Sequence, residues 1–547
     1  MTFREFLNEN IVVLDGGMGT LLQEQGLGAG EAPEKWNLTH PDAITAIHRA
    51  YFEAGSHVVS TNTFGANPLK YGEEELEAIV AAAIASARAA QEGIVHPTYV
   101  ALDIGPSGKL LKPLGDLDFE DAVAAFAAVV RLGVKYGVDA ILIETFNDCY
   151  ETKAAILAAK ENSDLPILVS NAYGADGKLM TGATPAAMVA LCEGLGVDAI
   201  GANCSLGPRQ LLGVVQELLA NASIPVLFMP NAGIPRVQDG VTFFDVSAAD
   251  FAETIAEPVR DGVRVVGGCC GTTPDYIRAL SEGVSALTPA QLTDKGLTVV
   301  SSYTHAVNFA NAPLLIGERI NPTGKKRFKA ALLENDMDYI LNEGISQQEK
   351  GVHILDVNVG LPDIDEPALL CEAVERLQAV IDLPLQIDTA DPVAMEAALR
   401  RYNGKALVNS VSGKRESMEA VFPLVKKYGG TVIALTLDEE GIPATAEGRV
   451  AIAKRILDTA AAYGIDKKDI VFDTLTMTVS ADPQAAVTTL EALRRIREEL
   501  GCHTSLGVSN VSFGLPCREV LNSTFFLIAL ESGLSAAIMI PPSGEMM

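Results

Sequence analysis

The stretch AILIETFNDCYETKAAILAAKENSDLPILVSNAY, residues 140–173, contains the unit that decides the fold. It starts with a short run rich in β-branched residues, AILIETF (140–146), and continues with an Ala- and Leu-rich segment of helical composition. It ends with a second short run, PILVSNAY (166–173). A strand, a helix and a second strand in this order form a βαβ unit, whose strands lie parallel in one sheet. The stretch therefore predicts an α/β protein with parallel strands.

The same unit repeats over the first half of the chain, where eight such runs occur. Eight strand–helix units are the number that closes a TIM-type (β/α)8 barrel. A barrel over 1–285 is therefore predicted, with a doubly wound open sheet as the alternative. The eight runs are IVVLDG (11–16), HVVSTNTF (57–64), TYVALDIG (98–105), AILIETF (140–146), PILVSNAY (166–173), AIGANCSL (199–206), PVLFMPNA (225–232) and VRVVGGCC (263–270).

A second series of eight runs follows a polar segment at 286–312, which we interpret as a linker. It predicts a second TIM-type barrel over 313–547. Only PSGEMM (542–547) follows the last run, so we expect this barrel to lack its closing helix. The runs are PLLIGERI (313–320), ILDVNVG (354–360), PLQIDTA (384–390), ALVNSVS (406–412), TVIALTL (431–437), IVFDTLT (470–476), HTSLGVSN (503–510) and SAAIMIP (535–541).

Composition agrees with a cytoplasmic enzyme that acts on small molecules. The chain has 547 residues, of which 48% are hydrophobic and 20% charged, values typical of globular enzymes. The net charge is −29 and Lys and Arg are scattered, which argues against nucleic acids and anionic membranes as partners. MTFREFLNEN (1–10) is no secretory signal, and AVAAFAAVV (122–130) is too short to span a membrane. Eight cysteines are too few for a disulfide scaffold and indicate a reducing compartment.

Most of the runs end in polar or small residues, and barrel active sites lie at the C-terminal ends of strands. In the first barrel, Cys204 ends the sixth run while Cys269 and Cys270 end the eighth, so all three thiols are expected at one opening. Three thiolates with an open fourth position describe a catalytic zinc site. The spacing lacks a CxxC pair, so Cys204 as a core residue beside an incidental vicinal pair is the alternative. The other cysteines are expected to be small buried side chains: Cys149, Cys192, Cys371, Cys502 and Cys517.

Five blocks of the first barrel resemble the zinc-dependent homocysteine methyltransferase family. The resemblance implies zinc held by Cys204, Cys269 and Cys270, with the homocysteine sulfur as the replaceable ligand. A free thiol is mostly protonated at neutral pH, whereas a zinc-bound thiol is deprotonated and can attack a methyl group. The blocks are LDGGMGT (14–20), TNTFGAN (61–67), GANCSLGP (201–208), PNAG (230–233) and GGCCGTTP (267–274).

Homocysteine also needs partners for its ammonium and carboxylate groups. Glu144 resembles the family's acidic residue for the amino group, and Asp15 stands close by on the first strand. Asn231 could support the metal site or serve as a temporary oxygen ligand. For Asp15 and Gly16 a plain strand-to-loop turn is the alternative. Backbone N–H groups for the carboxylate are expected at Gly16, Gly17, Phe64 and Gly65.

The second series resembles the pterin-binding barrel family shared by methionine synthases, corrinoid methyltransferases and dihydropteroate synthases. The resemblance implies that Asp388, Asn409 and Asp473 hydrogen-bond the pterin ring, and that Asn510 faces N5, the nitrogen that carries the methyl group. A single strand-end Asp or Asn is more often a helix N-cap, but here several stand in family order. The blocks are ERINPTGKK (318–326), ILDVN (354–358), QIDT (386–389), LVNS (407–410), VFD (471–473) and LGVSNVSFGLPCR (506–518), and the further expected site residues are Asn321, Asp356, Asn358 and Arg518.

Together the two resemblances suggest the N-terminal half of the cobalamin-dependent methionine synthase family. They imply a methyltransferase that moves the methyl group of 5-methyltetrahydrofolate to homocysteine by way of cobalamin. None of the seven histidines lies in the family's DxHxxG cobalamin motif, so we expect a corrinoid carrier on another domain or chain. Two alternatives remain: a bifunctional enzyme with a dihydropteroate-synthase-like second barrel, and a non-catalytic subunit that presents substrates.

Overall fold

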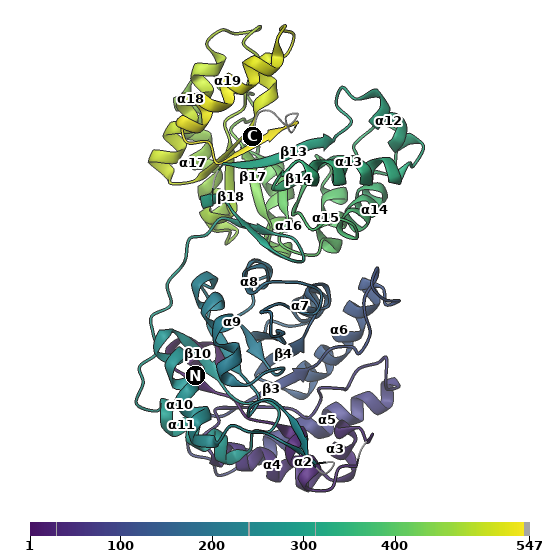
Figure 1. The fold of residues 1–547 in the computed structure, drawn as a ribbon, viewed down its shortest axis with the longest axis vertical. Coiled ribbons are helices and arrows are strands. Elements are labelled where there is room, and N and C mark those ends of the chain that lie inside the picture. Colours follow the sequence, from purple (N-terminus) through teal and green to yellow (C-terminus); the bar gives the residue numbers. More distant parts are fainter. Residues whose placement is uncertain (29, 239–240, 312, 541–547) are drawn as a thin grey trace. The chain divides into compact units, whose positions relative to one another are not determined.

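The chain folds into two compact units, one from Met1 to Lys295 and one that begins at Gly296. The structure, a computed structural model, describes residues 1–28, 30–238, 241–311 and 313–540. Figure 1 shows that each unit is built from strands with helices around them.

The sheet of the first unit contains eight parallel strands in the order β1-β10-β7-β6-β5-β4-β3-β2. The two end strands meet as well, because the backbone N–H of His57, at the start of β2, donates to the carbonyl of Val13 in β1 (2.7 Å). All eight predicted runs form strands, and the predicted TIM-type barrel is confirmed. Its strands are β1 (Val12–Val13), β2 (Val58–Ser60), β3 (Tyr99–Ile104), β4 (Ala140–Phe146), β5 (Ile167–Asn171), β6 (Ala199–Asn203), β7 (Val226–Met229) and β10 (Val263–Val266).

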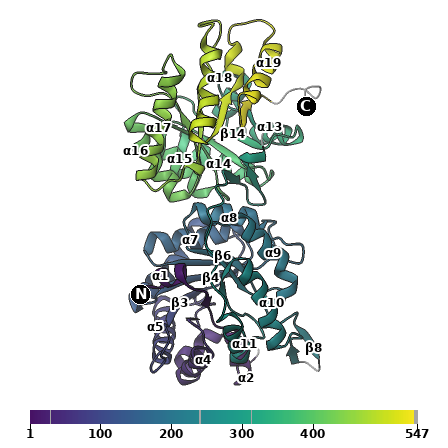
Figure 2. The same cartoon turned by 90° about the vertical axis from the view of Figure 1, so that its left-hand side faces the viewer.

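Helices of the first unit surround these strands (Figure 2). α6 illustrates the local signals that set their ends: Asp118 accepts the N–H of Glu120 (3.0 Å) at its start, and Gly137 ends it at φ +83°. A short antiparallel hairpin, β8 (Arg236–Gln238) and β9 (Val241–Phe243), lies outside the barrel sheet. The helices are α1 (Phe3–Glu9), α2 (Met18–Glu24), η1 (Pro33–Lys35), α3 (Trp36–Thr39), α4 (Pro41–Glu53), α5 (Glu73–Ala90), α6 (Phe119–Tyr136), α7 (Cys149–Asn162), α8 (Pro185–Gly194), α9 (Pro208–Asn221), α10 (Ala248–Asp261) and α11 (Pro274–Val284).

The first helix, α1, covers the N-terminal end of the first barrel. Its residues Phe3, Phe6 and Leu7 are buried and belong to the same apolar cluster as the first residues of several strands. The rings of Phe3 and Phe6 lie 5.2 and 5.5 Å from that of Tyr99, at the start of β3. This end of the barrel is therefore filled with side chains, and the polar strand ends lie at the opposite end.

The second unit contains a closed barrel in which eight parallel strands are paired in chain order, so the second predicted barrel is confirmed. The strands are β13 (Leu314–Ile320), β14 (Ile354–Val357), β15 (Leu385–Asp388), β16 (Leu407–Ser412), β17 (Thr431–Leu435), β18 (Ile470–Asp473), β19 (His503–Gly507) and β20 (Ala536–Met539). The helical segments are η2 (Phe309–Asn311), α12 (Lys326–Leu333), α13 (Met337–Glu349), α14 (Glu366–Gln378), α15 (Pro392–Arg401), α16 (Arg415–Tyr428), α17 (Ala446–Ala462), η3 (Lys467–Asp469), α18 (Ala485–Arg495), η4 (Ile496–Leu500), η5 (Val508–Ser512) and α19 (Arg518–Glu531).

Part of the predicted linker 286–312 is a structural element of the second unit. β11 (Val299–Ser301) and β12 (Ala306–Asn308) form an antiparallel hairpin. Val300 and Phe309 are fully buried in the apolar cluster at the base of the barrel, and the N–H of Ser301 donates to the carbonyl of Lys405 (2.9 Å). In the sequence these two apolar residues stand among polar ones, so they form no recognisable apolar pattern. The prediction that a closing helix is missing falls on 541–547, outside the described residues.

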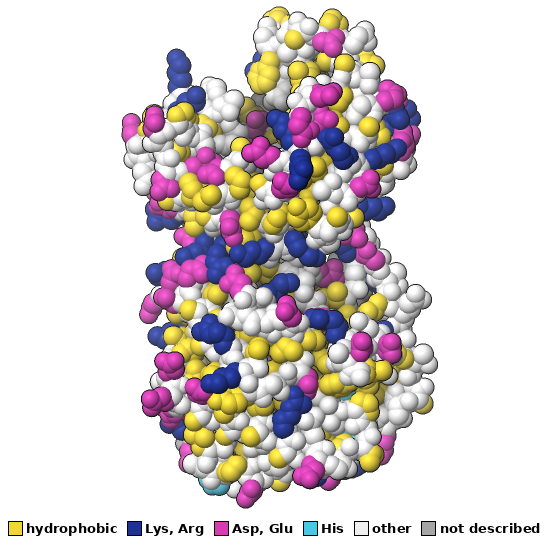
Figure 3. Space-filling model, turned by 180° about the vertical axis from the view of Figure 1, so that it is seen from behind, with side chains coloured by type: hydrophobic (Ala, Val, Ile, Leu, Met, Phe, Trp, Pro, Cys, Tyr) yellow, Lys and Arg dark blue, Asp and Glu magenta, His cyan; other side chains and the backbone are white. Residues whose placement is uncertain are grey.

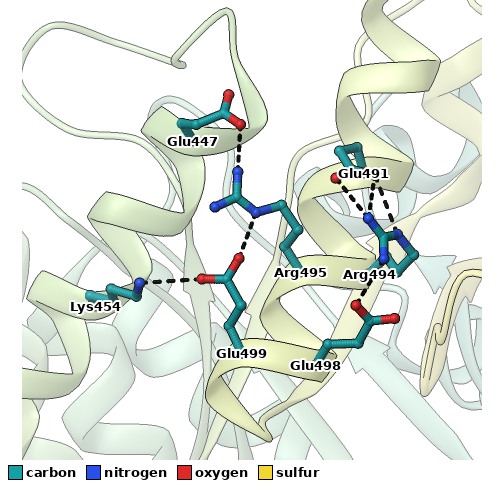
Figure 4. A network of polar contacts seen from close by, with 7 residues as sticks. All are labelled: Glu447, Lys454, Glu491, Arg494, Arg495, Glu498 and Glu499. Atoms are coloured by element: carbon teal, nitrogen blue, oxygen red, sulfur yellow. Dashed lines mark hydrogen bonds and ion pairs between the residues drawn. The ribbon is translucent and has the colours of Figure 1, made fainter.

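On the face drawn in Figure 3, Lys and Arg side chains are interspersed with Asp and Glu side chains. In the second unit a network of ion pairs joins α17 to α18 and η4 (Figure 4). Its centre is Arg495, which contacts Glu447 and Glu499 (both 2.6 Å). Within the described residues, no helix combines the length and the apolar character needed to cross a membrane.

Candidate functional site

The three cysteines singled out in the sequence come together at the C-terminal end of the first barrel. Cys204 directly follows β6, and Cys269 and Cys270 follow β10. Their sulfur atoms all lie within 4.8 Å of one another, with 3.9 Å between the Sγ atoms of Cys204 and Cys270. Three sulfurs at about 2.3 Å from one tetrahedral zinc ion would lie about 3.8 Å apart. The spacing of the sulfurs therefore fits a metal ion of this kind.

The backbone at Cys204 is held in an unusual conformation. Cys204 and Ser205 both have φ of +58°, in the left-handed region that favours glycine. Each such residue costs about 1–3 kcal/mol and persists only where its surroundings fix it. Here the N–H of Cys204 donates to the carbonyl of Met229 (3.1 Å), at the end of β7. The turn thus aims the Cys204 sulfur toward Cys269 and Cys270 at a cost in stability, a feature common at functional sites.

The three thiols do not titrate alike. Hydrogen bonds from the Cys269 and Cys270 thiols lower the pKa of Cys204 to about 3. The same contact raises the pKa of Cys270 to about 12, because its thiol donates to Cys204. Burial instead raises the pKa of Cys149, which lies inside the helical layer. Cys204 is therefore the thiol of the cluster that ionises most readily, and the thiolate is the form that binds metals.

The other cysteines lie outside this cluster. Cys149, Cys192 and Cys502 are buried, as expected, and Cys371 is half-buried. Cys517 is exposed, so the expectation that it is buried is wrong. It is the N-cap of α19 and lies at the surface of the second unit.

Three carboxyl groups lie together in the mouth of the first barrel, next to the cysteines. Asp15 and Glu144 were predicted, and Asp103, the fifth residue of β3, was not. Burial raises the pKa of Asp15 to about 7, and burial with the nearby Asp15 and Cys204 raises the pKa of Glu144 to about 8. Burial, Glu144 and Asp15 also raise the pKa of Asp103. A cation entering this mouth would relieve the repulsion among the three groups.

Asp103 is the carboxyl group best placed to receive such a cation. It is 6% exposed, and among the described residues its Oδ1 atom has no hydrogen-bond partner. Asp15, in contrast, accepts hydrogen bonds from the backbone N–H and the hydroxyl of Ser60 (both 2.9 Å). Asp103 stands in the predicted run TYVALDIG (98–105) but was not selected from the sequence, although its position matches that of the other strand-end acids.

The glycine-rich strand ends are packed tightly rather than open. A Cβ on Gly16 would lie 2.7 Å from Oγ1 of Thr272, and the N–H of Gly17 already donates to the carbonyl of Thr272 (3.2 Å). The N–H of Gly105 donates to the carbonyl of Phe64 (3.2 Å), whose side chain is 43% exposed. A Cβ on Gly65 would lie 2.7 Å from Oε1 of Glu34. Only glycine fits at Gly16 and Gly65 without movement of these neighbours.

Two asparagines support the cysteines. The Oδ1 of Asn231 accepts the backbone N–H of Cys270 (3.1 Å), so this predicted residue holds the loop that carries the thiol. Asn203, which the sequence reasoning did not select, lies directly before Cys204 and is fully buried. Its side-chain amide contacts Glu144, near the end of β4, and the sulfur of Cys269. Nothing in the sequence distinguishes it from the other strand-end asparagines.

In the second barrel, the predicted residues at β14 and β15 form two side-chain pairs. Oδ1 of Asp356 accepts a hydrogen bond from Gln386 (2.6 Å), and Asn358 donates to Oδ2 of Asp388 (3.0 Å). Burial raises the pKa of Asp356, and raises that of Asp388 to about 6. Asn409 lies beside Asp388 in the register of β15 and β16. Polar side chains of β14, β15 and β16 thus lie side by side in this barrel.

Asp473 and Asn321 lie on other strands of the same barrel. Asp473 ends β18, accepts the N–H of Leu475 (2.7 Å), and has its pKa raised to about 6 by burial. Asn321 follows β13 directly, is 8% exposed and accepts the N–H of Thr323 (2.9 Å). Polar side chains thus line the mouth from β13 to β18.

The last two predicted residues follow β19. Asn510 lies in η5, and its Nδ2 atom would be 2.9 Å from a Cβ on Gly507. Arg518 begins α19 and is exposed; it donates to Oγ of Ser512 and to the carbonyl of Ser509 (both 3.0 Å). Arg518 therefore holds the loop that carries Asn510.

Two charged residues of the second barrel, Glu318 and Arg449, were not selected from the sequence. Burial raises the pKa of Glu318, which faces Lys325 and Arg518. Arg449 of α17 is 3% exposed and donates to the carbonyls of Thr474 (2.6 Å) and Leu475 (3.1 Å), next to Asp473. Glu318 lies within the quoted ERIN block, whereas Arg449 lies in a helix, where sequence alone shows no link to the site.

Comparisons with known proteins agree with this two-part organisation. Residues 12–284 match the homocysteine S-methyltransferase family, and residues 317–539 match the pterin-binding enzyme family. Methionine synthases from Mycobacterium leprae (strain TN) and Mycobacterium tuberculosis (strain ATCC 25618 / H37Rv) are each 33% identical to the chain, over 574 and 570 residues. Both alignments cover 98% of this chain and 48% of the relative, so the chain spans about half the length of these curated relatives.

Among solved structures, the homocysteine methyltransferase MmuM from Escherichia coli in its oxidized form is similar to one part of the chain. It is 24% identical, with a TM-score of 0.44, and the match covers 50% of this chain and 95% of that one.

Proposed function

Because the chain belongs to the homocysteine S-methyltransferase family over its first unit and to the pterin-binding enzyme family over its second, we propose that it is a methyltransferase of the methionine synthase type. The first unit binds homocysteine and the second binds 5-methyltetrahydrofolate. The methyl group passes to homocysteine by way of a cobalamin carrier on another domain or chain, and the product is methionine. The observation that carries this proposal is the meeting of three sulfurs beside buried carboxyl groups.

In this proposal Cys204, Cys269 and Cys270 would hold a zinc ion that also takes the homocysteine sulfur as a ligand. When bound, zinc keeps a thiol deprotonated at neutral pH, which makes the sulfur a nucleophile. The thiolate character of Cys204 and the sulfur spacing support this role. The Asn231 amide keeps the Cys270 loop in place. Free thiols of this kind require a reducing compartment, which supports a cytoplasmic location.

The carboxyl groups of Asp15, Asp103 and Glu144 would receive the ammonium group of homocysteine. Burial raises the pKa values of these groups, and an ammonium ion beside them would favour their ionised forms and lower those pKa values again. Backbone N–H groups of the strand ends at Gly16 and Phe64–Gly65 would face the carboxylate. The N–H of Gly17 is already bonded to Thr272 and contributes only to the shape of this turn.

In the second unit, the amides and carboxylates would form hydrogen bonds with the edge of the pterin ring, which is a planar array of donors and acceptors. Asp388, Asn409 and Asp473 are proposed to contact the ring, with the remaining predicted residues around them. Asn510 would face N5, where a hydrogen bond that strengthens as N5 accepts a proton would help the methyl group to leave. The remaining proposed site residues are Asn321, Asp356, Asn358 and Arg518.

Metal analysis tests the first half of this proposal. We expect about one zinc ion per chain, with Zn–S distances near 2.3 Å by X-ray absorption. Cys204→Ala should lose the zinc, whereas Cys517→Ala, which removes an exposed cysteine outside the cluster, should retain it. Equal zinc content in the Cys204→Ala variant and the wild type would contradict the assignment.

Calorimetry tests whether the homocysteine thiol is deprotonated on binding. Homocysteine binding should release about one proton as the thiol becomes a thiolate, which measurements in buffers of different ionisation enthalpy detect. Methyl transfer from methylcobalamin to homocysteine should then separate a catalyst from a subunit that only presents substrates. Binding without proton release would contradict thiol activation.

A further inference from the structure

Asn203 is the last residue of β6, directly before Cys204, and its side chain is fully buried. Its Oδ1 atom accepts hydrogen bonds from the backbone N–H of Thr145 (3.0 Å) and the hydroxyl of Ser170 (2.9 Å). Its Nδ2 atom lies 2.7 Å from Oγ1 of Thr145, 3.5 Å from Oε2 of Glu144 and 3.9 Å from Sγ of Cys269. One amide thus connects the ends of β4, β5 and β6 with the loop after β10.

The orientation of this amide is fixed by its partners. The N–H of Thr145 can only donate, so the atom facing it must be the amide oxygen. The amide nitrogen therefore faces Glu144 and Cys269. It has two hydrogens, and the short contact to Oγ1 of Thr145 takes one of them. The second hydrogen lies between the Glu144 carboxylate and the Cys269 sulfur.

The same amide stabilises the turn that presents Glu144. Thr145, the next residue, has φ of +66°, in the left-handed region that a β-branched residue rarely adopts. Asn203 binds both the backbone N–H and the hydroxyl of Thr145. Because a strained residue persists only where its surroundings fix it, Asn203 helps to keep the Glu144 side chain directed into the mouth of the barrel.

We propose that Asn203 is a positioning residue that serves the metal site and the amino-acid site together, through one N–H group shared by Cys269 and Glu144. This inference rests on the proposed function. An N–H directed at a thiolate sulfur disperses its negative charge and fixes its position as a ligand. The bonds to Thr145 fix the position of Glu144, which would receive the substrate ammonium group. Loss of the amide nitrogen should therefore weaken both metal binding and homocysteine binding.

Asn203→Asp provides the test, because it keeps the shape and the acceptor oxygen but removes both N–H donors. Ser170→Ala is the matched control, because it removes a partner from the oxygen end of the same amide. We expect Asn203→Asp to lower zinc affinity roughly ten- to a hundredfold, measured by competition with a chromogenic chelator. Homocysteine affinity of the zinc-loaded protein should fall as well. Ser170→Ala should resemble the wild type in both.

Two further measurements separate positioning from general damage. In cobalt-substituted protein, the sulfur-to-cobalt charge-transfer band should shift in Asn203→Asp and stay in place in Ser170→Ala. Glu144→Gln should weaken homocysteine binding while zinc affinity is retained, since it leaves the Cys269 sulfur untouched. If Asn203→Asp does not fold, Asn203→Ala removes the same donors without adding charge.

The outcomes are distinguishable. If the wild type binds zinc and Asn203→Asp or Asn203→Ala matches it in zinc affinity and in the cobalt spectrum, the inference is overturned. If both variants bind zinc more weakly but their zinc-loaded forms bind homocysteine as tightly as the wild type, the coupling to Glu144 is overturned. If the wild type itself binds no zinc, the proposed function fails instead.

Discussion

His57 and Val13 exchange two hydrogen bonds where the first barrel closes between β1 and β2. The backbone N–H of His57 donates to the carbonyl of Val13 (2.7 Å), and Nδ1 of His57 accepts the N–H of Val13 (3.0 Å). The ring must therefore be neutral, with no proton on Nδ1. Burial, helped by the nearby His96, lowers the pKa of His57 to about 4.

The burial of His57 makes the first barrel less stable in acid. The unfolded chain takes up a proton on His57 near its ordinary pKa of about 6.5, while the folded chain resists until about pH 4. The contribution of His57 to the free energy of unfolding is therefore fully present above pH 6.5. It is lost as the pH falls from 6.5 to 4, which lowers the free energy of unfolding by up to about 3 kcal/mol. Urea unfolding at different pH values measures this loss. The fluorescence of Trp36, the single tryptophan, reports on the first unit, in which it is buried.

His57→Asn serves as the comparison for this effect, because its side chain does not titrate in this range. The fall in unfolding free energy from pH 7 to pH 5 should be smaller in the variant than in the wild type. Other buried histidines, such as His48, titrate in both proteins and cancel in the difference. Parallel pH curves would show that His57 does not carry the effect.

Asp103→Asn should weaken homocysteine binding by roughly ten- to a hundredfold, the range for one hydrogen bond to a charged group. The unpartnered Oδ1 of Asp103 is the atom we expect to face the substrate ammonium. 4-Mercaptobutanoate lacks that ammonium, so its affinity should change little in the variant. Calorimetry with both thiols on zinc-loaded protein compares them, and equal losses for the two would show that Asp103 acts only on the shape of the site.

Asn510→Ala should lower the rate of methyl transfer from 5-methyltetrahydrofolate to an added corrinoid by roughly ten- to a thousandfold. Methyltetrahydrofolate affinity should fall much less, because N5 becomes a better partner only as it is protonated. Single-turnover kinetics and equilibrium binding measure the two quantities. Equal losses in rate and affinity would make Asn510 a binding residue only.

Asp473→Asn should behave differently, with losses in pterin affinity and in rate together. Burial raises the pKa of Asp473 to about 6, so its carboxylate is protonated as the pH falls below 6. Wild-type affinity for methyltetrahydrofolate should therefore decrease below that pH. The decrease should be shallower in Asp473→Asn, with the remainder due to Asp388, whose pKa is also about 6. A variant with the full wild-type pH dependence would exclude Asp473 as the titrating group.

Phe309→Ala should destabilise the second unit by about 3–5 kcal/mol, the usual cost of removing a buried phenylalanine. Phe309 is fully buried under the barrel, whereas Phe513 is 48% exposed, so Phe513→Ala is the matched control. Circular dichroism during urea unfolding should show an earlier transition only for Phe309→Ala. The transition reported by Trp36 should not move, because Trp36 lies in the first unit.

The sequence was sufficient to predict both barrels, because each strand is a short apolar run flanked by helical segments. It also identified Cys204, Cys269 and Cys270, because all strand ends of a barrel face one opening and because the surrounding blocks resemble the homocysteine methyltransferase family. It could not identify Asp103 or Asn203. Their importance depends on which side chains face inward and on the left-handed turns at Thr145 and Cys204, which residue types alone do not reveal.

The base of each barrel was also beyond sequence reasoning. α1 and the β11–β12 hairpin each contribute only two or three apolar residues to the core, too few to give a periodic pattern. The polar residues of 286–312 therefore suggested a linker, although Val300 and Phe309 are fully buried.

The closure of the first barrel by α1 has a kinetic consequence for the proposed reaction. Because Phe3, Phe6 and Leu7 fill one end, homocysteine and methionine must pass through the same opening that the methyl carrier has to approach. Homocysteine must then enter before the carrier arrives, and methionine can depart only after the carrier has withdrawn. Steady-state kinetics should accordingly show compulsory-order addition with homocysteine first, and an excess of the methylated carrier should inhibit turnover by blocking an empty barrel.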